Sequence, residues 1–290
     1  MKKIFTLAAM LLAAFAANAQ NESTKENSDL LSIGDYAGLL ENGDDSQCYQ
    51  GSFYAKCPTT FYLKHTGTQI IYTKEELQKM AGKDITGIKF LYNNASGTQA
   101  YPRTVKVWLM ETGESAFSYN EKDQNYDFFN YDAATQTVNG YNFDYDFSEV
   151  YGMNGELIIN FDNPFKYSGN KNLLVVITFD GEETTGGSMD VNFFCNSDIK
   201  KRAMTYVNDG YSFEDYKATE DWPATNLETG TNLELPVTQF VFKDSGTSGI
   251  NNAITETAGE NSPVFHISGQ RVSREYKGLV ITNGKKYFRK

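Results

Sequence analysis

The middle of the chain alternates apolar and polar side chains with a period of two residues. In one segment Val105, Val107 and Leu109 share one face of an extended strand, while Lys106 and Trp108 share the other. Such alternation is typical of a strand with one face against a core. Similar runs predict strands at residues 59–71, 85–92, 104–110, 135–143, 156–161, 172–179, 189–195, 203–207 and 236–242. The sequence therefore predicts an all-β fold, a jelly-roll-like two-sheet β-sandwich with a small C-terminal β tail.

Composition agrees with this fold, because 19 Tyr, 20 Phe and 24 Gly stand against only 6 Pro. Aromatic residues favour strands, and Gly, Asn and Asp favour the turns between them. One segment departs from the pattern: Thr73 followed by Glu76 is a capping box, and Gly82 is a stop signal. These residues predict one short helix, at residues 74–81.

The chain begins with the three zones of a secretory signal. Lys2 and Lys3 precede an apolar run at residues 4–15, and Ala17-Asn18-Ala19 matches the A-x-A cleavage pattern. We therefore expect a signal peptide at residues 1–19 and an extracytoplasmic protein, either secreted or at the cell surface. No later segment approaches the roughly 20 apolar residues of a membrane helix, so no transmembrane span is expected in the mature chain.

Composition shifts divide the rest of the chain. Residues 20–29 are polar and predict a flexible leader, residues 30–243 form the predicted β-sandwich domain, and residues 244–252 read as a linker. Residues 253–290 form the predicted β tail, with Asn283-Gly284 as a hairpin turn. The formal net charge of −11 would repel phosphates, so no nucleic acid partner is expected.

The text VFHISGQRVSREYKGLVITNGKKYFRK at residues 264–290 resembles the C-terminal sorting domains of Bacteroidetes proteins exported by type IX secretion. The resemblance implies that export machinery is a partner of the tail. No Tyr-Pro-Asn-Pro strand precedes the match, and Val280 stands where Tyr is usual. A periplasmic or otherwise secreted form is therefore the alternative to anchoring at the cell surface.

Two segments in the middle, at residues 69–77 and 163–176, look like a β-sandwich module of surface and secreted proteins of gut and oral Bacteroidetes. The resemblance spans about residues 33–243. It implies a non-catalytic, adhesin-like role, and it supplies no binding residues.

Three cysteines, Cys48, Cys57 and Cys195, are an odd number for an oxidising compartment. Cys48 and Cys57 are closest in sequence, and they are our disulfide candidate. A pairing that uses Cys195 would instead connect the N-terminal segment to a late strand. The third alternative is that all three are small, buried, apolar groups.

The chain carries few signs of catalysis. Of its two histidines, only His65 lies outside the tail, and no G-x-S-x-G or H-E-x-x-H pattern accompanies it. A structural His65 is therefore the favoured interpretation. Asp144, Asp146 and Glu149 are the best candidates for paired acids of a glycoside hydrolase, although charges on a strand edge also protect it from pairing.

Aromatic residues in polar loops are the candidate ligand-binding groups, namely Tyr126, Phe128, Tyr131 and Trp222, with Phe117, Tyr119 and Phe129 in the same region. Exposed rings among amides and acids suit sugar binding, whereas rings packed over the sandwich would act as plugs. No cofactor is expected. Structural calcium is possible at the acidic loops of residues 43–45, 180–183 and 208–210.

Together these features predict a non-catalytic binding module that recognises a glycan or an extracellular protein. The alternatives are a carbohydrate-active hydrolase that uses loop carboxylates, and a structural component of a surface assembly. A cleft between two acids would favour the hydrolase, an aromatic patch the binder, and an exposed apolar strand edge the assembly protein.

Overall fold

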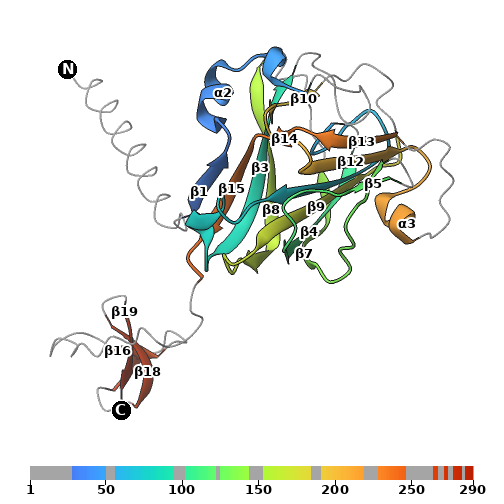
Figure 1. Cartoon of the computed structure of the whole chain (residues 1–290). Coiled ribbons are helices and arrows are strands. Elements are labelled where there is room, and N and C mark those ends of the chain that lie inside the picture. Colours follow the sequence, from blue (N-terminus) through green and yellow to red (C-terminus); the bar gives the residue numbers. More distant parts are fainter. Residues whose placement is uncertain are drawn as a thin grey trace, which may run out of the picture. The chain divides into compact units, whose positions relative to one another are not determined.

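The chain divides into two compact units, Met1–Ser245 and Gly246–Lys290 (Figure 1). The structure is a computed structural model, and it describes residues 28–49, 56–94, 102–121, 125–143, 153–183, 191–218, 228–245, 264–266, 271–273, 277–282 and 285–289. The predicted signal peptide and most of the predicted leader and linker lie outside these ranges. Among the described residues, no helix combines the length and the apolar character that a membrane crossing requires.

The first unit contains two antiparallel sheets that pack together. The five-stranded sheet has the order β1-β15-β3-β10, with β8 paired to the other side of β3. Its strands are β1 (Asp29–Ile33), β15 (Thr238–Lys243), β3 (Asp84–Asn94), β10 (Val191–Phe193) and β8 (Asn154–Lys166). The first described strand of the unit therefore pairs with the last one.

The six-stranded sheet has the order β13-β12-β2-β9-β4-β7. Its strands are β13 (Glu228–Leu233), β12 (Ala203–Asn208), β2 (His65–Tyr72), β9 (Asn172–Asp180), β4 (Arg103–Thr112) and β7 (Thr135–Phe143). The predicted all-β two-sheet sandwich is thus confirmed. The jelly-roll connectivity stays a prediction.

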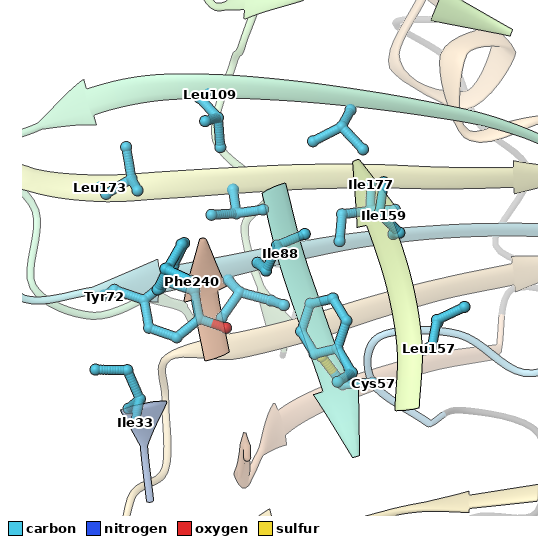
Figure 2. Close-up of a cluster of buried hydrophobic side chains, with 14 of the residues drawn as sticks. Ile33, Cys57, Tyr72, Ile88, Leu109, Leu157, Ile159, Leu173, Ile177 and Phe240 are labelled. Carbon is cyan, nitrogen blue, oxygen red and sulfur yellow. The ribbon is translucent and has the colours of Figure 1, made fainter. Parts of the chain in front are cut away.

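The main hydrophobic core lies between the two sheets. Figure 2 shows side chains of one sheet, Leu109, Leu173 and Ile177, near side chains of the other, Ile88, Ile159 and Phe240. The Tyr72 and Phe240 rings meet edge to face at 4.9 Å, and the Tyr72 hydroxyl lies 2.7 Å from Thr238 Oγ1. The hydroxyl is therefore satisfied inside an apolar core, as a buried polar group requires.

The outer face of the six-stranded sheet is also covered. Trp108, predicted to lie opposite the core, is only 8 % exposed, and it packs in a second hydrophobic cluster. The cluster consists of Ile71, Trp108, Phe117, Tyr131, Leu174, Val176, Met204, Tyr206 and Phe213. β9 has apolar neighbours on both faces, and accordingly residues 173–177 form a continuous apolar run rather than an alternating pattern.

The helical elements differ from the single predicted helix. Residues 74–77 form a turn, followed by the 3₁₀ helix η2 (Gln78–Met80), so the prediction of a helix over residues 74–81 is wrong in its extent. The capping box does form, with Thr73 N donating to Glu76 Oε2 at 2.8 Å. Two α-helices were not predicted, α2 (Tyr36–Asn42) and α3 (Phe213–Ala218), and neither was the 3₁₀ helix η1 (Asp45–Gln47).

Short strands complete the first unit. β5 (Tyr119–Asn120) pairs with β6 (Asn125–Tyr126), and β11 (Cys195–Asn196) pairs with β14 (Leu235–Pro236). The first pair belongs to the loop region that connects β4 and β7. The second pair lies near helix α2, whose Tyr36 packs with Leu91 of the five-stranded sheet.

The second unit contains a four-stranded sheet with the order β17-β16-β18-β19. Its strands are β16 (Val264–His266), β17 (Arg271–Val272), β18 (Gly278–Thr282) and β19 (Lys285–Arg289). Thr282 lies opposite Lys285, which confirms the predicted hairpin around residues 283–284. Val280 of β18 is fully buried.

Candidate functional site

Five polar residues form one row across the six-stranded sheet, which we call the polar row. Strand pairing places Asn208 opposite His65, His65 opposite Asp180, Asp180 opposite Thr104, and Thr104 opposite Asn142. Each residue comes from a different strand, in the order β12, β2, β9, β4 and β7. Antiparallel pairing therefore brings together side chains that are far apart in the sequence.

A cavity of about 410 Å³ lies at the β4, β7 and β9 end of the polar row, and we call it the Arg103 pocket. It is lined by Pro102, Arg103, Thr104, Asn142, Asp180, Gly181, Glu182 and Glu183. Three members of the polar row are thus among its walls. The lining offers carboxylates, a hydroxyl, an amide and a guanidinium group, which together can accept and donate several hydrogen bonds.

Arg103 forms a fixed wall of this pocket. Its side chain is only 2 % exposed; Nη1 donates to the Glu183 carbonyl at 2.8 Å, and Nη2 lies 3.3 Å from the carbonyls of Phe61 and Leu63. Burial lowers the pKa of Arg103, and the charge of Asp180 opposes that effect. An arginine nevertheless stays protonated, so the pocket keeps one buried positive charge.

Gly181 makes this arrangement possible. A Cβ atom at position 181 would lie 1.9 Å from Arg103 Nη1, so any other residue would displace the guanidinium group. The absence of a side chain at Gly181 therefore lets the Arg103 guanidinium group lie close to the backbone, which is a common role of glycine.

His65 and Asp180 form the centre of the polar row. His65 Nδ1 lies 2.8 Å from Asp180 Oδ1, and the two side chains are 20 % and 21 % exposed. In the described part of the chain, Asp180 is the hydrogen-bond partner of the His65 ring, and no Ser or Cys side chain bonds to it. A histidine oriented by a carboxylate is half of a nucleophilic triad, and the nucleophile is missing among these residues.

Loop aromatics occupy the outer face of the same sheet. Tyr131 is 8 % exposed and stacks on Phe213 at 6.0 Å, and half-buried Phe128 lies 5.0 Å from the Phe213 ring. Phe117 is 3 % exposed, whereas Tyr119 is 53 % exposed. Tyr131 therefore presents little ring area to a sugar, and the ring acts as a plug over the sheet.

Other predicted site residues lie outside the described part of the chain. Trp222, Asp144, Asp146 and Glu149 are among them. Tyr126 is described only by its backbone, which pairs with Tyr119 in the β5–β6 hairpin. Binding by Tyr126 and Trp222 stays a prediction.

The disulfide predicted between Cys48 and Cys57 is not formed in the structure, where all three cysteines are free thiols. Cys48 packs with Phe194 and Leu91 in one hydrophobic cluster, and Cys57 belongs to the main core. Burial raises the pKa of Cys48 and of Cys195 to about 12, so both stay protonated at neutral pH. The arrangement matches the alternative in which the cysteines are apolar groups.

A second cavity, also of about 410 Å³, lies beside these thiols. It is lined by Gly34, Asp35, Leu39, Ser46, Gln47, Cys48, Cys195, Asn196, Ser197, Glu234 and Val237. Its lining mixes apolar and polar groups, and unlike the Arg103 pocket it has no buried charged residue among its walls.

No metal site is evident in the described ranges, since no group of three or more His, Cys, Asp or Glu side chains is placed to hold an ion. Two of the acidic loops considered for calcium use a side-chain oxygen within the loop itself. Asp44 accepts from Ser46 N at 2.9 Å, and Asn208 accepts from Gly210 N at 2.7 Å. These contacts are typical of turns and helix caps.

Comparisons with protein-family models, with curated proteins and with solved structures found no match to this chain.

Sequence reasoning missed the Arg103 pocket. Residues 180–183 are predicted from the sequence only as an acidic loop, and Arg103 is not among the candidate site residues. A signal was present in the sequence, because a charged residue at the first position of a strongly apolar strand has to bury its charge or turn it toward a ligand. No comparable signal in the sequence indicates that β4 pairs with β7 and β9, which supply other walls of the pocket.

Proposed function

We propose that this protein is a non-catalytic binding module that acts outside the cytoplasm and recognises a glycan through the Arg103 pocket. One observation carries the proposal. The polar row ends at the Arg103 pocket, and the buried guanidinium group of Arg103 forms one wall of that pocket. The secretory pattern at residues 1–19 supports the location. Residues 253–290 are proposed to be read by export machinery.

The chemistry of the pocket suits a ligand with many hydroxyl groups. Asp180 and Glu182 supply carboxylate oxygens that accept hydrogen bonds, whereas Thr104 and Asn142 can both donate and accept. A sugar ring presents hydroxyls that do both. The cavity volume falls within the roughly 300–1,000 Å³ range of small-molecule sites, so one or two sugar units would fit.

The pocket is also held in place before a ligand arrives. Arg103 joins the carbonyls of residues 61 and 63 to that of Glu183, and Asp180 is held by His65. Preorganised groups lose little conformational entropy on binding, which favours affinity. The same contacts favour a binding role over a catalytic one, because no serine or cysteine side chain hydrogen-bonds to the His65 ring among the described residues.

Assembly through strand edges finds less support. Within the described residues, β8 is an edge strand that pairs only with β3, and it carries Asp162, Pro164 and Lys166. Charges and proline are the devices that prevent edge-to-edge pairing. Asp162, Pro164 and Lys166 therefore protect this part of the β8 edge, whereas Ile158 on the same strand is 42 % exposed.

Glycan-array binding of the full chain tests the proposal. We expect binding that weakens at least about tenfold, or 1.4 kcal/mol, when Asn142→Ala or Glu182→Ala removes a pocket group. Glu114→Ala changes an exposed carboxylate outside the pocket and should leave binding unchanged.

Tyr126→Ala and Trp222→Ala test the aromatic candidates on the same array. Loss of binding with these variants alone would move the site away from the Arg103 pocket. Release of reducing sugar from a bound polysaccharide would overturn the non-catalytic role.

A further inference from the structure

Three polar side chains from distant segments meet beside the five-stranded sheet. Lys56 Nζ contacts Asn192 Oδ1, and Asn192 Nδ2 donates to Asp45 Oδ1 at 2.7 Å. Lys56 is 7 % exposed and Asn192 is 6 % exposed. Lysine is almost never buried this deeply without a special partner, because burial of its charge is costly. Here one partner is the Asn192 side-chain amide, whose nitrogen donates to the Asp45 carboxyl group.

We propose that Lys56 and Asn192 become joined by an intramolecular isopeptide bond, with Asp45 as the group that moves the proton. The inference rests on which end of the Asn192 amide each partner contacts. The amine lies on the oxygen side of the amide, next to the carbonyl carbon that it would attack. The amide nitrogen, which would leave, lies against an acid that can protonate it.

The reaction needs no oxidant, reductant or co-reactant. Neutral Lys56 Nζ attacks Asn192 Cγ, and a new Nζ–Cγ bond forms. Asp45 takes a proton from the attacking nitrogen and delivers one to Nδ2, after which the Cγ–Nδ2 bond breaks and ammonia leaves. The proton that the lysine loses beforehand departs with the ammonia as ammonium. The product is a secondary amide, and Asp45 ends in its starting state.

The surrounding structure holds each reacting group in position. Asn192 lies in β10, opposite Asn93 of β3, and its carbonyl accepts a hydrogen bond from Cys48 Sγ at 3.5 Å. The Lys56 carbonyl accepts from Thr205 Oγ1 at 3.3 Å. Oriented groups at contact distance react far faster than free ones, because the entropy of bringing them together has already been lost.

Among the described residues, Cys48 is the other nucleophilic group near these side chains. Cys48 lies near both Asp45 and Lys56, and burial raises the pKa of its thiol to about 12. The thiol is therefore protonated at neutral pH and is a weak nucleophile there. Asp45 and Cys48 are the titratable groups that these contacts place around Lys56.

The bond would join segments 136 positions apart. Lys56 precedes β2 of the six-stranded sheet, whereas Asn192 belongs to the five-stranded sheet. A covalent link would thus tie the two layers of the sandwich together without any disulfide, and it would persist under reducing conditions.

Mass spectrometry of the purified wild-type protein tests the proposal. We expect an intact mass about 17 Da below that of the unmodified sequence, the mass of one ammonia. After trypsin digestion, Lys56 should be found uncleaved in a branched peptide that contains Asn192. This peptide distinguishes the link from cyclisation of Gln20, which would lose the same mass at the processed N-terminus.

Conservative variants complete the experiment, with folding checked by circular dichroism. Lys56→Arg keeps the charge and Asn192→Leu keeps much of the side-chain size, and both should restore the full mass, because the first removes the amine and the second removes the acyl carbon. Asp45→Asn should slow or abolish the loss of ammonia. Lys166→Arg, at an exposed lysine of β8, should retain the deficit.

A wild-type protein of full mass, with Lys56 cleaved normally by trypsin, would overturn the proposal. A deficit that persists in Lys56→Arg and does not map to Gln20 in the digest would also overturn it.

Discussion

Arg202 forms a two-pronged ion pair with Glu76 across 126 positions of the chain. Nη1 lies 2.6 Å from Oε2, and Nη2 lies 2.8 Å from Oε1. The arginine side chain is 10 % exposed and the glutamate side chain 25 %. The pair joins the turn after β2 to the start of β12, so it supports one end of the six-stranded sheet. Paired hydrogen bonds of this kind are among the strongest charged contacts in proteins.

Removal of the Glu76 charge should destabilise the fold. Glu76→Gln leaves the mostly buried Arg202 without its counter-ion, and we expect the free energy of unfolding in urea to fall by about 1–3 kcal/mol. Glu75→Gln is the matched control, because Glu75 is 71 % exposed and lies 3.8 Å from Lys74. Its effect should stay below about 0.5 kcal/mol. Equal decreases in the free energy of unfolding for the two variants would show that the Arg202–Glu76 pair adds no more stability than an exposed pair.

The same pair should make stability depend on acid pH. Burial raises the pKa of Glu76, but hydrogen bonds from Arg202 and Thr73 outweigh burial and hold the pKa below its ordinary value of 4.5. A group with a lowered folded-state pKa stabilises the fold above its unfolded pKa, and that contribution is lost as the pH falls. Wild type should thus lose stability below about pH 4.5 more steeply than Glu76→Gln. Urea midpoints of wild type and Glu76→Gln that change by the same amount from pH 7 to pH 3 would contradict this expectation.

Gly67 should not tolerate a side chain. A Cβ atom there would lie 2.1 Å from Cγ of Phe213, which is fully buried at the start of α3. Gly67→Ala should therefore displace Phe213 and lower the free energy of unfolding by about 1–3 kcal/mol. Gly113→Ala places its methyl group in open space and should change the thermal midpoint little. Indistinguishable melting curves for the two variants would mean that α3 moves at no cost.

The thiols should be inert in the folded protein. Burial raises the pKa of Cys48 and Cys195 to about 12, so at pH 8 only about one thiol in 10,000 is ionised. Protein purified under reducing conditions should react slowly with iodoacetamide and then completely in guanidinium chloride. Rapid modification of the native protein at neutral pH would show that the thiols are less buried than the structure indicates.

Strands could be predicted from the sequence better than helices. β7 spans residues 135–143, the range predicted for it, because Thr, Val, Tyr and Phe recur along this segment. α2 and α3 have only seven and six residues, too few for a helical period to be visible. A local signal for α3 was present, since Ser212 and Asp215 form a capping box in which Asp215 N donates to Ser212 Oγ at 3.1 Å.

The candidate sites could not be predicted for a different reason. His65 and Asp180 meet because β2 pairs with β9, and Lys56 meets Asn192 across the sandwich. Neither pairing leaves a trace in local composition, since strand order depends on contacts between distant segments. Tyr131 was equally ambiguous, because an aromatic residue in a polar loop looks the same whether it faces solvent or packs on Phe213.

The pairing of β1 with β15 has a consequence for the order of folding. Asp29 lies opposite Phe242, so one edge of the five-stranded sheet is made of residues synthesised first and residues synthesised more than two hundred positions later. Contacts so distant in sequence form slowly, since a long loop must close before they are gained. A growing chain can thus hold this edge open until nearly the whole domain has emerged, and the sandwich closes in a late step.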